Sequence, residues 1–131
     1  MVTYVVMGDP IPLARHRHSG RRTWDSQKQI KLVWGIDIRK QHFEQLGEYK
    51  YTGPLHVDII FYLPMPKCSV KKAQEIRGRY HIFTPDLSNM IKFVEDAATG
   101  ILFDNDSIVA SIASKKIYDD VPRTEFTITC L

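Results

Sequence analysis

Hydrophobic and polar residues alternate along several stretches of the chain, and this alternation predicts β-strands. The segment 55–63 has one apolar face and one mixed face, which predicts a central strand. The apolar face consists of Leu55, Val57, Ile59 and Phe61. The segments 3–7, 108–114 and 123–130 have the same strand character, and the polar link at 118–122 suits a hairpin loop between the last two.

Apolar residues recur every three or four positions in two other segments, which predicts helices. The first helix begins at Asp25-Ser26 and ends at Gly47. The apolar residues that recur along it at helical spacing are Ile30, Val33, Trp34, Ile38 and Phe43. The second begins at Thr84-Pro85-Asp86 and ends at Thr99-Gly100, and its predicted buried stripe contains Leu87, Met90, Ile91, Val94 and Ala98. A short helix is predicted over 69–78.

These elements predict an α+β fold, in which two main helices cover a small, mixed and mostly antiparallel sheet. The chain has 131 residues, so we expect a single domain over residues 1–131. Its apolar runs are far shorter than the ~20 residues that a bilayer span needs, and its start lacks the features of a signal peptide. Two cysteines are too few for a disulfide framework or a four-thiolate zinc site. We therefore expect a cytoplasmic protein without a membrane partner.

The net charge of +3 is small, but the charges are unevenly distributed. One basic block contains Arg15, Arg17, Arg21, Arg22, Lys28 and Lys31, and its part over 13–23 is expected to be an exposed loop or arm. A second basic block contains Lys67, Lys71, Lys72, Arg77 and Arg79. Between them and the C-terminus lies an acidic centre with Asp86, Glu95, Asp96, Asp104 and Asp106 against Lys92. This distribution suits a protein that binds a polyanion and does metal chemistry on it, although solvated surface charge explains the same composition.

The acidic centre contains the residue types that phosphodiester hydrolysis needs. A hard cation such as Mg²⁺ or Mn²⁺ binds carboxylate oxygens and keeps water in its open positions. Asp86 starts a predicted helix and Asp106 precedes a predicted strand at the same sheet edge, so we expect the two to converge on one ion. Lys92 lies about 1.7 helical turns after Asp86 and is placed to offset charge that develops on the phosphate.

Each of these residues also has an ordinary structural explanation. Asp86 is suited to cap the helix, Lys92 and Asp96 are spaced as an exposed i,i+4 pair, and 104–106 is suited to a turn. These explanations are the commoner ones for each residue taken alone. Their combination in one short segment favours a functional site.

The acidic centre also carries a family resemblance. It resembles the signature of the RusA family of Holliday-junction resolvases in the run Pro85-Asp86-Leu87-Ser88-Asn89-Met90-Ile91-Lys92, then Asp96, Gly100 and Asn105-Asp106-Ser107. The family pattern is Pro-Asp-x-Asp-Asn-hydrophobic-x-Lys, an Asp four residues later, a Gly, and Asp-Asp before a strand that ends in Lys. The strand end corresponds to Lys115-Lys116, and Gly8-Asp9-Pro10-Ile11-Pro12 is similar to the family's N-terminal Gly-x-Pro-x-Pro. The resemblance runs from about residue 4 to the C-terminus.

The resemblance implies a RusA-like fold and a homodimeric endodeoxyribonuclease that uses Mg²⁺ or Mn²⁺ to resolve four-way junctions, in DNA recombination and repair, often in phages or prophages. No small-molecule cofactor is implied. Catalytic roles fall on Asp86, Lys92, Asp106 and Asp96, where Asp96 orients Lys92 or completes the metal shell. Metal contacts fall on Asp86, Asp106, Ser88 and Asp104. The residues expected to bind branched DNA are Arg15, Arg17, Arg21, Arg22, Lys28, Lys71, Lys72 and Lys116.

Two positions depart from the family pattern. Its second Asp is Ser88 here, and the first member of its later Asp pair is Asn105. Neither residue supplies negative charge, and divalent-ion affinity depends on the charge of the ligands. A catalytically weakened protein that binds branched DNA without cutting it is therefore the main alternative, and a basic structural or interaction protein is a third hypothesis.

Overall fold

The computed structural model describes the whole chain except residue 16 and the side chain of Arg17. Its elements in chain order are β1 (Val2–Met7), β2 (Arg17–Ser19), β3 (Arg22–Trp24), α1 (Lys28–Leu46), β4 (Leu55–Pro64), α2 (Val70–Ile76), α3 (Leu87–Ala98), the 3₁₀ turn η1 (Asp106–Ile108), β5 (Val109–Asp119) and β6 (Arg123–Cys130). The predicted helices and strands are thus confirmed within a few residues, and β5 is longer than expected because it continues through residue 119.

Four strands of the described chain form one sheet in the order β1-β6-β4-β5. β6 pairs antiparallel with both β1 and β4, whereas β4 and β5 run parallel. The predicted α+β class, with a mixed sheet and β4 as a central strand, is therefore confirmed. The predicted hairpin between the last two strands is wrong, because β4 lies between β5 and β6 and the link after β5 joins strands that are not neighbours.

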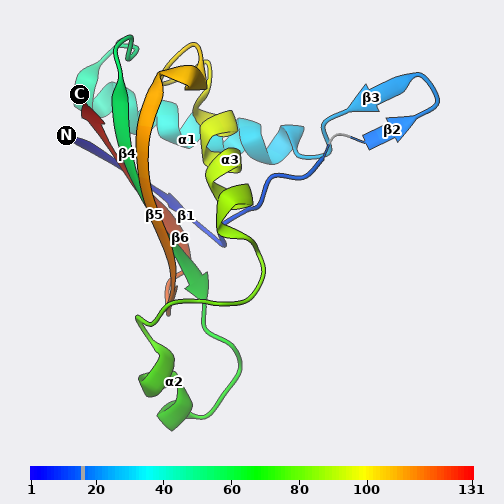
Figure 1. Ribbon diagram of the computed structural model, residues 1–131, viewed down its shortest axis with the longest axis vertical. Helices are drawn as coiled ribbons and strands as arrows, with labels where there is room; N and C mark the ends of the chain where they lie inside the picture. Colours follow the sequence, from blue (N-terminus) through cyan, green and yellow to red (C-terminus); the bar gives the residue numbers. More distant parts are fainter. Residues whose placement is uncertain (16) are drawn as a thin grey trace.

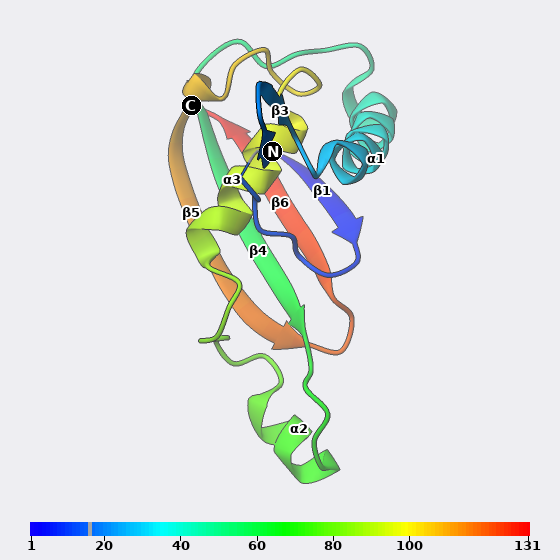
Figure 2. The same cartoon turned by 90° about the vertical axis from the view of Figure 1, so that its right-hand side faces the viewer.

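Helices α1 and α3 cover the same face of this sheet (Figures 1 and 2). Side chains alternate along a strand, so β4 sends every second residue into the core: Leu55, Val57, Ile59, Phe61 and Leu63. Phe93 of α3 meets Trp34 of α1 edge to face, with ring centroids 5.1 Å apart. This packing determines which side of α3 faces solvent.

Two basic segments project from the body of the molecule (Figure 1). The strands β2 and β3 pair as a hairpin within the polar segment expected to be an exposed arm. The hairpin turns at Gly20, whose φ of 59° favours a residue without Cβ. The short helix α2 extends beyond the end of β4, where Ser69 caps it by accepting a hydrogen bond from the Lys72 N–H.

Only part of the apolar set that recurs along α1 is buried. The buried side chains are Trp34, Ile38 and His42, and the exposed ones are Ile30, Val33 and Phe43. Apolar residues lie all around this helix, so the spacing alone does not select the side that packs on the sheet. No helix in the described residues is long and apolar enough to cross a bilayer.

A buried hydrogen-bond network joins β1 to α1. His42 Nε2–H donates to the carbonyl oxygen of Tyr49, which only accepts, so Nδ1 is the acceptor nitrogen of the neutral ring. The Tyr4 hydroxyl therefore donates to His42 Nδ1 at 2.6 Å, and its oxygen lies 3.3 Å from the Tyr51 hydroxyl. Burial, followed by the contact with Tyr51, raises the pKa of Tyr4. The tyrosine thus stays neutral and ties the helix to the sheet.

Tyr4→Phe is expected to lower the free energy of unfolding by about 1–3 kcal/mol, because it leaves His42 Nδ1 buried without a donor. Urea denaturation measures this change. Tyr80→Phe is the matched control, since Tyr80 is 70% exposed, and it should change the value by less than about 0.5 kcal/mol. A Tyr4→Phe effect no larger than that of the control would show that the network does not stabilise the fold.

Candidate functional site

Asp86 stands at the start of the helix that carries the acidic centre. It occupies the N-cap position of α3 with an extended backbone, and its side chain makes no capping hydrogen bond. The helix is instead joined to it through the main chain, where Met90 N–H donates to the Asp86 carbonyl at 3.2 Å. The side chain is exposed. Capping therefore does not explain the Asp86 carboxylate.

The solvent-facing side of α3 is the side opposite its core residues. Those core residues are Met90, Phe93, Val94, Ala97 and Ala98. At about 100° per residue, Ser88, Lys92 and Glu95 lie within roughly 60° of one another on the other side. Ser88 and Lys92 are exposed and Glu95 is half-buried. One face of α3 thus presents a hydroxyl, an ammonium and a carboxylate in successive turns.

The carboxyl groups of Glu95 and Asp106 are in contact. Asp106 begins η1, and its side chain forms a hydrogen bond with that of Glu95. Burial, followed by the charge and hydrogen bond of Asp106, raises the pKa of Glu95, and the nearby Lys92 ammonium opposes this rise. Carboxyl groups held together in this way are typical of sites that bind a cation. Glu95 had no predicted role in the site, and the only signal for it in the sequence was its position on the same helix face, three residues after Lys92.

Asp106 meets Glu95, whereas Asp86 was its expected partner. Asp86 and Glu95 are nine positions apart, which is about 13 Å along the helix axis. A Mg²⁺ ion needs its ligands at about 2.1 Å. Asp86 and the Glu95–Asp106 pair therefore lie towards opposite ends of α3, with Lys92 between them along the helix.

Two other acids that were predicted to belong to the site form ion pairs with lysines elsewhere in the fold. Asp96 was expected to lie against Lys92, but its carboxylate forms an ion pair with Lys31 of α1 at 2.6 Å. Asp104, expected to contact a metal, pairs with Lys50 at 2.6 Å, and its side chain is 83% exposed. Both contacts join separate segments of the fold, so neither acid is directed at the Glu95–Asp106 pair in this structure.

The donor chemistry of the Glu95–Asp106 pair fits a hard divalent cation. Among the residues that the structure describes, no group of three or more His, Cys, Asp or Glu side chains is arranged to hold a metal. Mg²⁺, however, is commonly held by only one or two carboxylates together with water and substrate phosphates. Asn105, at the position of a family Asp, accepts a hydrogen bond from Ser107 N–H at 2.9 Å and caps η1. Two carboxylates are therefore within the number of protein ligands that Mg²⁺ sites use.

Most of the basic residues expected to bind DNA are exposed. Beside or within the β2–β3 hairpin these are Arg15, Arg21, Arg22 and Lys28, and on α2 they are Lys71 and Lys72. The side chain of Arg17, also expected to bind DNA, lies outside the described part of the chain. The hairpin and α2 project at different ends of the molecule, and α3 lies between them (Figure 1). The acid-bearing face is thus flanked by two basic projections.

Lys116 has a different environment from the other basic residues. It is half-buried in β5 and pairs in register with Phe61 of β4. Its ammonium donates to the carbonyl oxygens of Phe83 and Pro85, the latter at 2.7 Å. The charge of Lys116 therefore contacts the turn that precedes Asp86.

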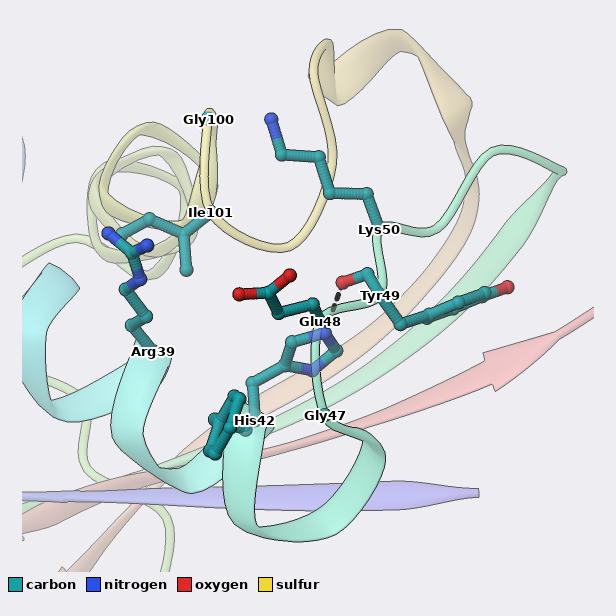
Figure 3. Close-up of a pocket in the computed structure, with 9 residues that line it drawn as sticks. Arg39, His42, Gly47, Glu48, Tyr49, Lys50, Gly100 and Ile101 are labelled. Atoms are coloured by element: carbon teal, nitrogen blue, oxygen red, sulfur yellow. Dashed lines mark hydrogen bonds between the residues drawn. The ribbon is translucent and has the colours of Figure 1, made fainter.

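A cavity of about 620 Å³ lies away from the acidic face, between the end of α1, the loop after it and the turn at Gly100 (Figure 3). The charged side chains of Arg39, Glu48 and Lys50 line this cavity. Both ring nitrogens of His42 already have hydrogen-bond partners, so the imidazole has no free nitrogen for a ligand. A DNA backbone is bound along open, basic surfaces. The exposed face of α3 lies between two such basic projections, so it is the better candidate for nuclease chemistry.

Comparison with known proteins agrees with the sequence motif. A family model described as "Endodeoxyribonuclease RusA" matches residues 7–129, which include α3, η1 and both basic projections. The chain is also similar to the uncharacterized protein YqaN of Bacillus subtilis (strain 168), with 30% identity over 138 aligned positions that cover 97% of this chain and 94% of YqaN. The chain belongs to the RusA family of endodeoxyribonucleases.

Proposed function

We propose that this protein is a Mg²⁺- or Mn²⁺-dependent nuclease that resolves four-way DNA junctions in recombination and repair, in a phage or prophage setting. Membership of the RusA family implies a Holliday-junction nuclease. The observation that carries the metal-dependent chemistry is the contact between the carboxyl groups of Glu95 and Asp106 on the face of α3 that also bears Lys92.

The residues on and beside the exposed face of α3 have different proposed roles in phosphodiester cleavage. Glu95 and Asp106 are the proposed ligands of the ion. Asp86 and Ser88 lie too far along α3 to share that ion, and they are the proposed oxygen donors to water or to a second ion at the start of the helix. When bound, the ion would act as a Lewis acid on the phosphate and would lower the pKa of a water molecule that it binds. Lys92 offsets negative charge that develops on the phosphate oxygens.

Asp96 contributes to this arrangement through α1. Its ion pair with Lys31, which also binds Asp25 at 2.6 Å, connects α3 to the start of α1. The hydrogen bonds to these two acids raise the pKa of Lys31 although its burial acts in the opposite direction. Asp96 therefore holds the helix that carries Lys92 and Glu95, and its effect on catalysis is indirect.

The two basic projections are the proposed DNA-binding surfaces. The hairpin carries Arg21 and Arg22 at its exposed end, and Trp24 at its base is 43% exposed. Arginine side chains bind phosphates, and an exposed indole is able to stack on an unpaired base at a junction centre. Lys71 and Lys72 of α2 provide a second set of cations on the other side of α3.

Arg21→Ala/Arg22→Ala is expected to reduce the slope of log K for junction binding against log[salt] by about 1.8, because each neutralised phosphate contributes about 0.9. Fluorescence anisotropy with a labelled four-way junction, titrated at several salt concentrations, measures the slope. Arg39→Ala/Lys40→Ala removes the same charge from exposed positions of α1 and should leave the slope nearly unchanged. Equal slopes for both double variants would remove the hairpin from the DNA interface.

We also propose that the protein acts as a homodimer, since two symmetric cuts in a four-way junction need two sites related by two-fold symmetry. The support is an apolar strip on the exposed side of α1, where Leu32, Val33, Ile36 and Phe43 are each at least 60% exposed. Patches of this kind often mark association surfaces. Sedimentation equilibrium gives the oligomeric state directly.

Nicking of a synthetic four-way junction is the direct test of the proposed function. The junction and a linear duplex of the same sequence are incubated with the protein in Mg²⁺, in Mn²⁺ and in EDTA. Metal-dependent cutting of the junction alone is the expected result. Cutting in EDTA, or equal cutting of the linear duplex, would contradict the proposal.

A second candidate function is binding of branched DNA without cleavage. Ser88 and Asn105 favour it, since both replace family carboxylates with neutral groups, and Asn105 is engaged in capping η1. Metal-independent binding of the junction with no cutting in Mg²⁺ or Mn²⁺ distinguishes this function from the first. A protein that binds junction and duplex equally, and cuts neither, would fit a general basic interaction protein.

A further inference from the structure

Lys116 connects β5 to the turn that leads into α3. It lies in register with the buried Phe61 in the parallel β4–β5 pair, so its side chain leaves the sheet on the side that the helices cover. The ammonium donates to the carbonyl oxygens of Phe83 and Pro85. The main chain of the same residue accepts a hydrogen bond from His81 N–H at 3.0 Å. Side chain and backbone of Lys116 thus hold the segment 81–85 against the sheet.

These contacts fix the main chain on both sides of Asp86. The carbonyl just before it, that of Pro85, accepts from Lys116 at 2.7 Å. The carbonyl of Asp86 itself accepts from Met90 N–H inside α3. With both peptide groups held, the direction in which the Asp86 side chain leaves the backbone is also set. No capping hydrogen bond of the Asp86 side chain does this instead.

We propose that Lys116 is a positioning residue that orients the Asp86 carboxylate. It does not contact DNA, although its position in the sequence had suggested that it would. The inference rests on the proposed nuclease function, in which Asp86 takes part. Catalytic groups act only when they are held in the reactive geometry, and rigid supporting contacts provide this. With two of its three N–H donors on carbonyl oxygens, the half-buried Lys116 ammonium has a single donor left for a phosphate, whereas Lys71 and Lys72 of α2 are exposed.

Lys116→Met tests the proposal, because it keeps the length of the side chain and removes the ammonium. Lys115→Met is the matched control, since Lys115 is the exposed neighbour on the opposite face of the same strand. Single-turnover cleavage at saturating junction and Mg²⁺ is expected to slow by about tenfold or more for Lys116→Met, with the junction Kd in EDTA and its salt slope unchanged. Lys116→Arg, which restores donors to the carbonyls, is expected to recover most of the rate, and Lys115→Met to show no loss of rate.

The opposite pattern overturns the proposal. If Lys116→Met cuts at the wild-type rate when saturated but lowers the salt slope by about 0.9, Lys116 is a DNA contact. If the wild-type protein cuts no junction, the proposed function fails, and amide hydrogen exchange still tests the contact with the turn. Faster exchange confined to 83–90 in Lys116→Met supports it, and unchanged exchange overturns it.

A measurement on the wild-type protein covers the case in which Lys116→Met does not fold. The lysine ammonium groups are observed by ¹H–¹⁵N NMR with and without a four-way junction in EDTA. A Lys116 ammonium signal that exchanges slowly with water and keeps its position when junction is added supports the carbonyl contacts. A signal that shifts on junction binding, as those of Lys71 and Lys72 are expected to do, overturns the proposal.

Discussion

Asp86→Asn is expected to slow junction cleavage by about 100- to 1,000-fold, while junction binding stays as tight as in the wild type or becomes tighter. The substitution removes the negative charge and keeps the size of the side chain. It does not disturb the start of α3, because Asn and Asp are equally good at the N-cap position. Binding is expected not to weaken, because the substitution removes a carboxylate that repels the DNA phosphates beside it.

Single-turnover cleavage and anisotropy binding in EDTA separate these two effects for Asp86→Asn. Asp58→Asn is the matched control: Asp58 is an exposed acid of β4 on the uncovered side of the sheet, where it pairs with His56 at 3.2 Å. The control should cut and bind as the wild type does. Equal loss of binding and cleavage in folded Asp86→Asn protein would show that Asp86 supports the DNA interface and not the chemistry.

The sequence predicted best those elements whose pattern is strongly one-sided. Every second residue of β4 is buried and those between are half-buried or exposed, and α3 has a clear apolar stripe, so both were located from the sequence. The buried side of α1 was not, because its apolar residues surround the helix and Trp34 is selected only by packing against Phe93. The order of the strands also escaped prediction, since insertion of β4 between β5 and β6 is a property of the whole sheet.

Only those residues of the candidate site that belong to the sequence motif could be predicted. The motif indicated Asp86, Lys92 and Asp106, all of which lie on or beside the exposed face of α3. It did not indicate Glu95, because that contact depends on how the chain returns after the helix. Leu102 and Phe103 are buried there, and the anchored turn brings Asp106 back alongside α3. The ion pair of Asp96 with Lys31 depends on the packing of α1 against α3 in the same way.

Asp106→Asn and Glu95→Gln are each expected to weaken Mn²⁺ binding by about tenfold or more and to slow junction cleavage by about 100-fold. Each change removes one of two carboxylates that contact each other, so the site loses half of the negative charge that it offers to the ion. Titration calorimetry of the metal-free protein with Mn²⁺ measures binding without relying on activity. The double variant is expected to be little worse than either single variant, because residues that act as a unit have non-additive effects.

Asp104→Asn is the matched control for this pair. Asp104 lies two positions before Asp106, carries the same charge, and pairs with Lys50 outside the acidic face. Its substitution should change Mn²⁺ affinity and cleavage by less than about twofold, as expected for an exposed ion pair. If Asp104→Asn abolished Mn²⁺ binding while Glu95→Gln left it intact, the ion would be held on the loop before η1 and not on α3. The carboxyl contact between Glu95 and Asp106 would then be a feature of the fold alone.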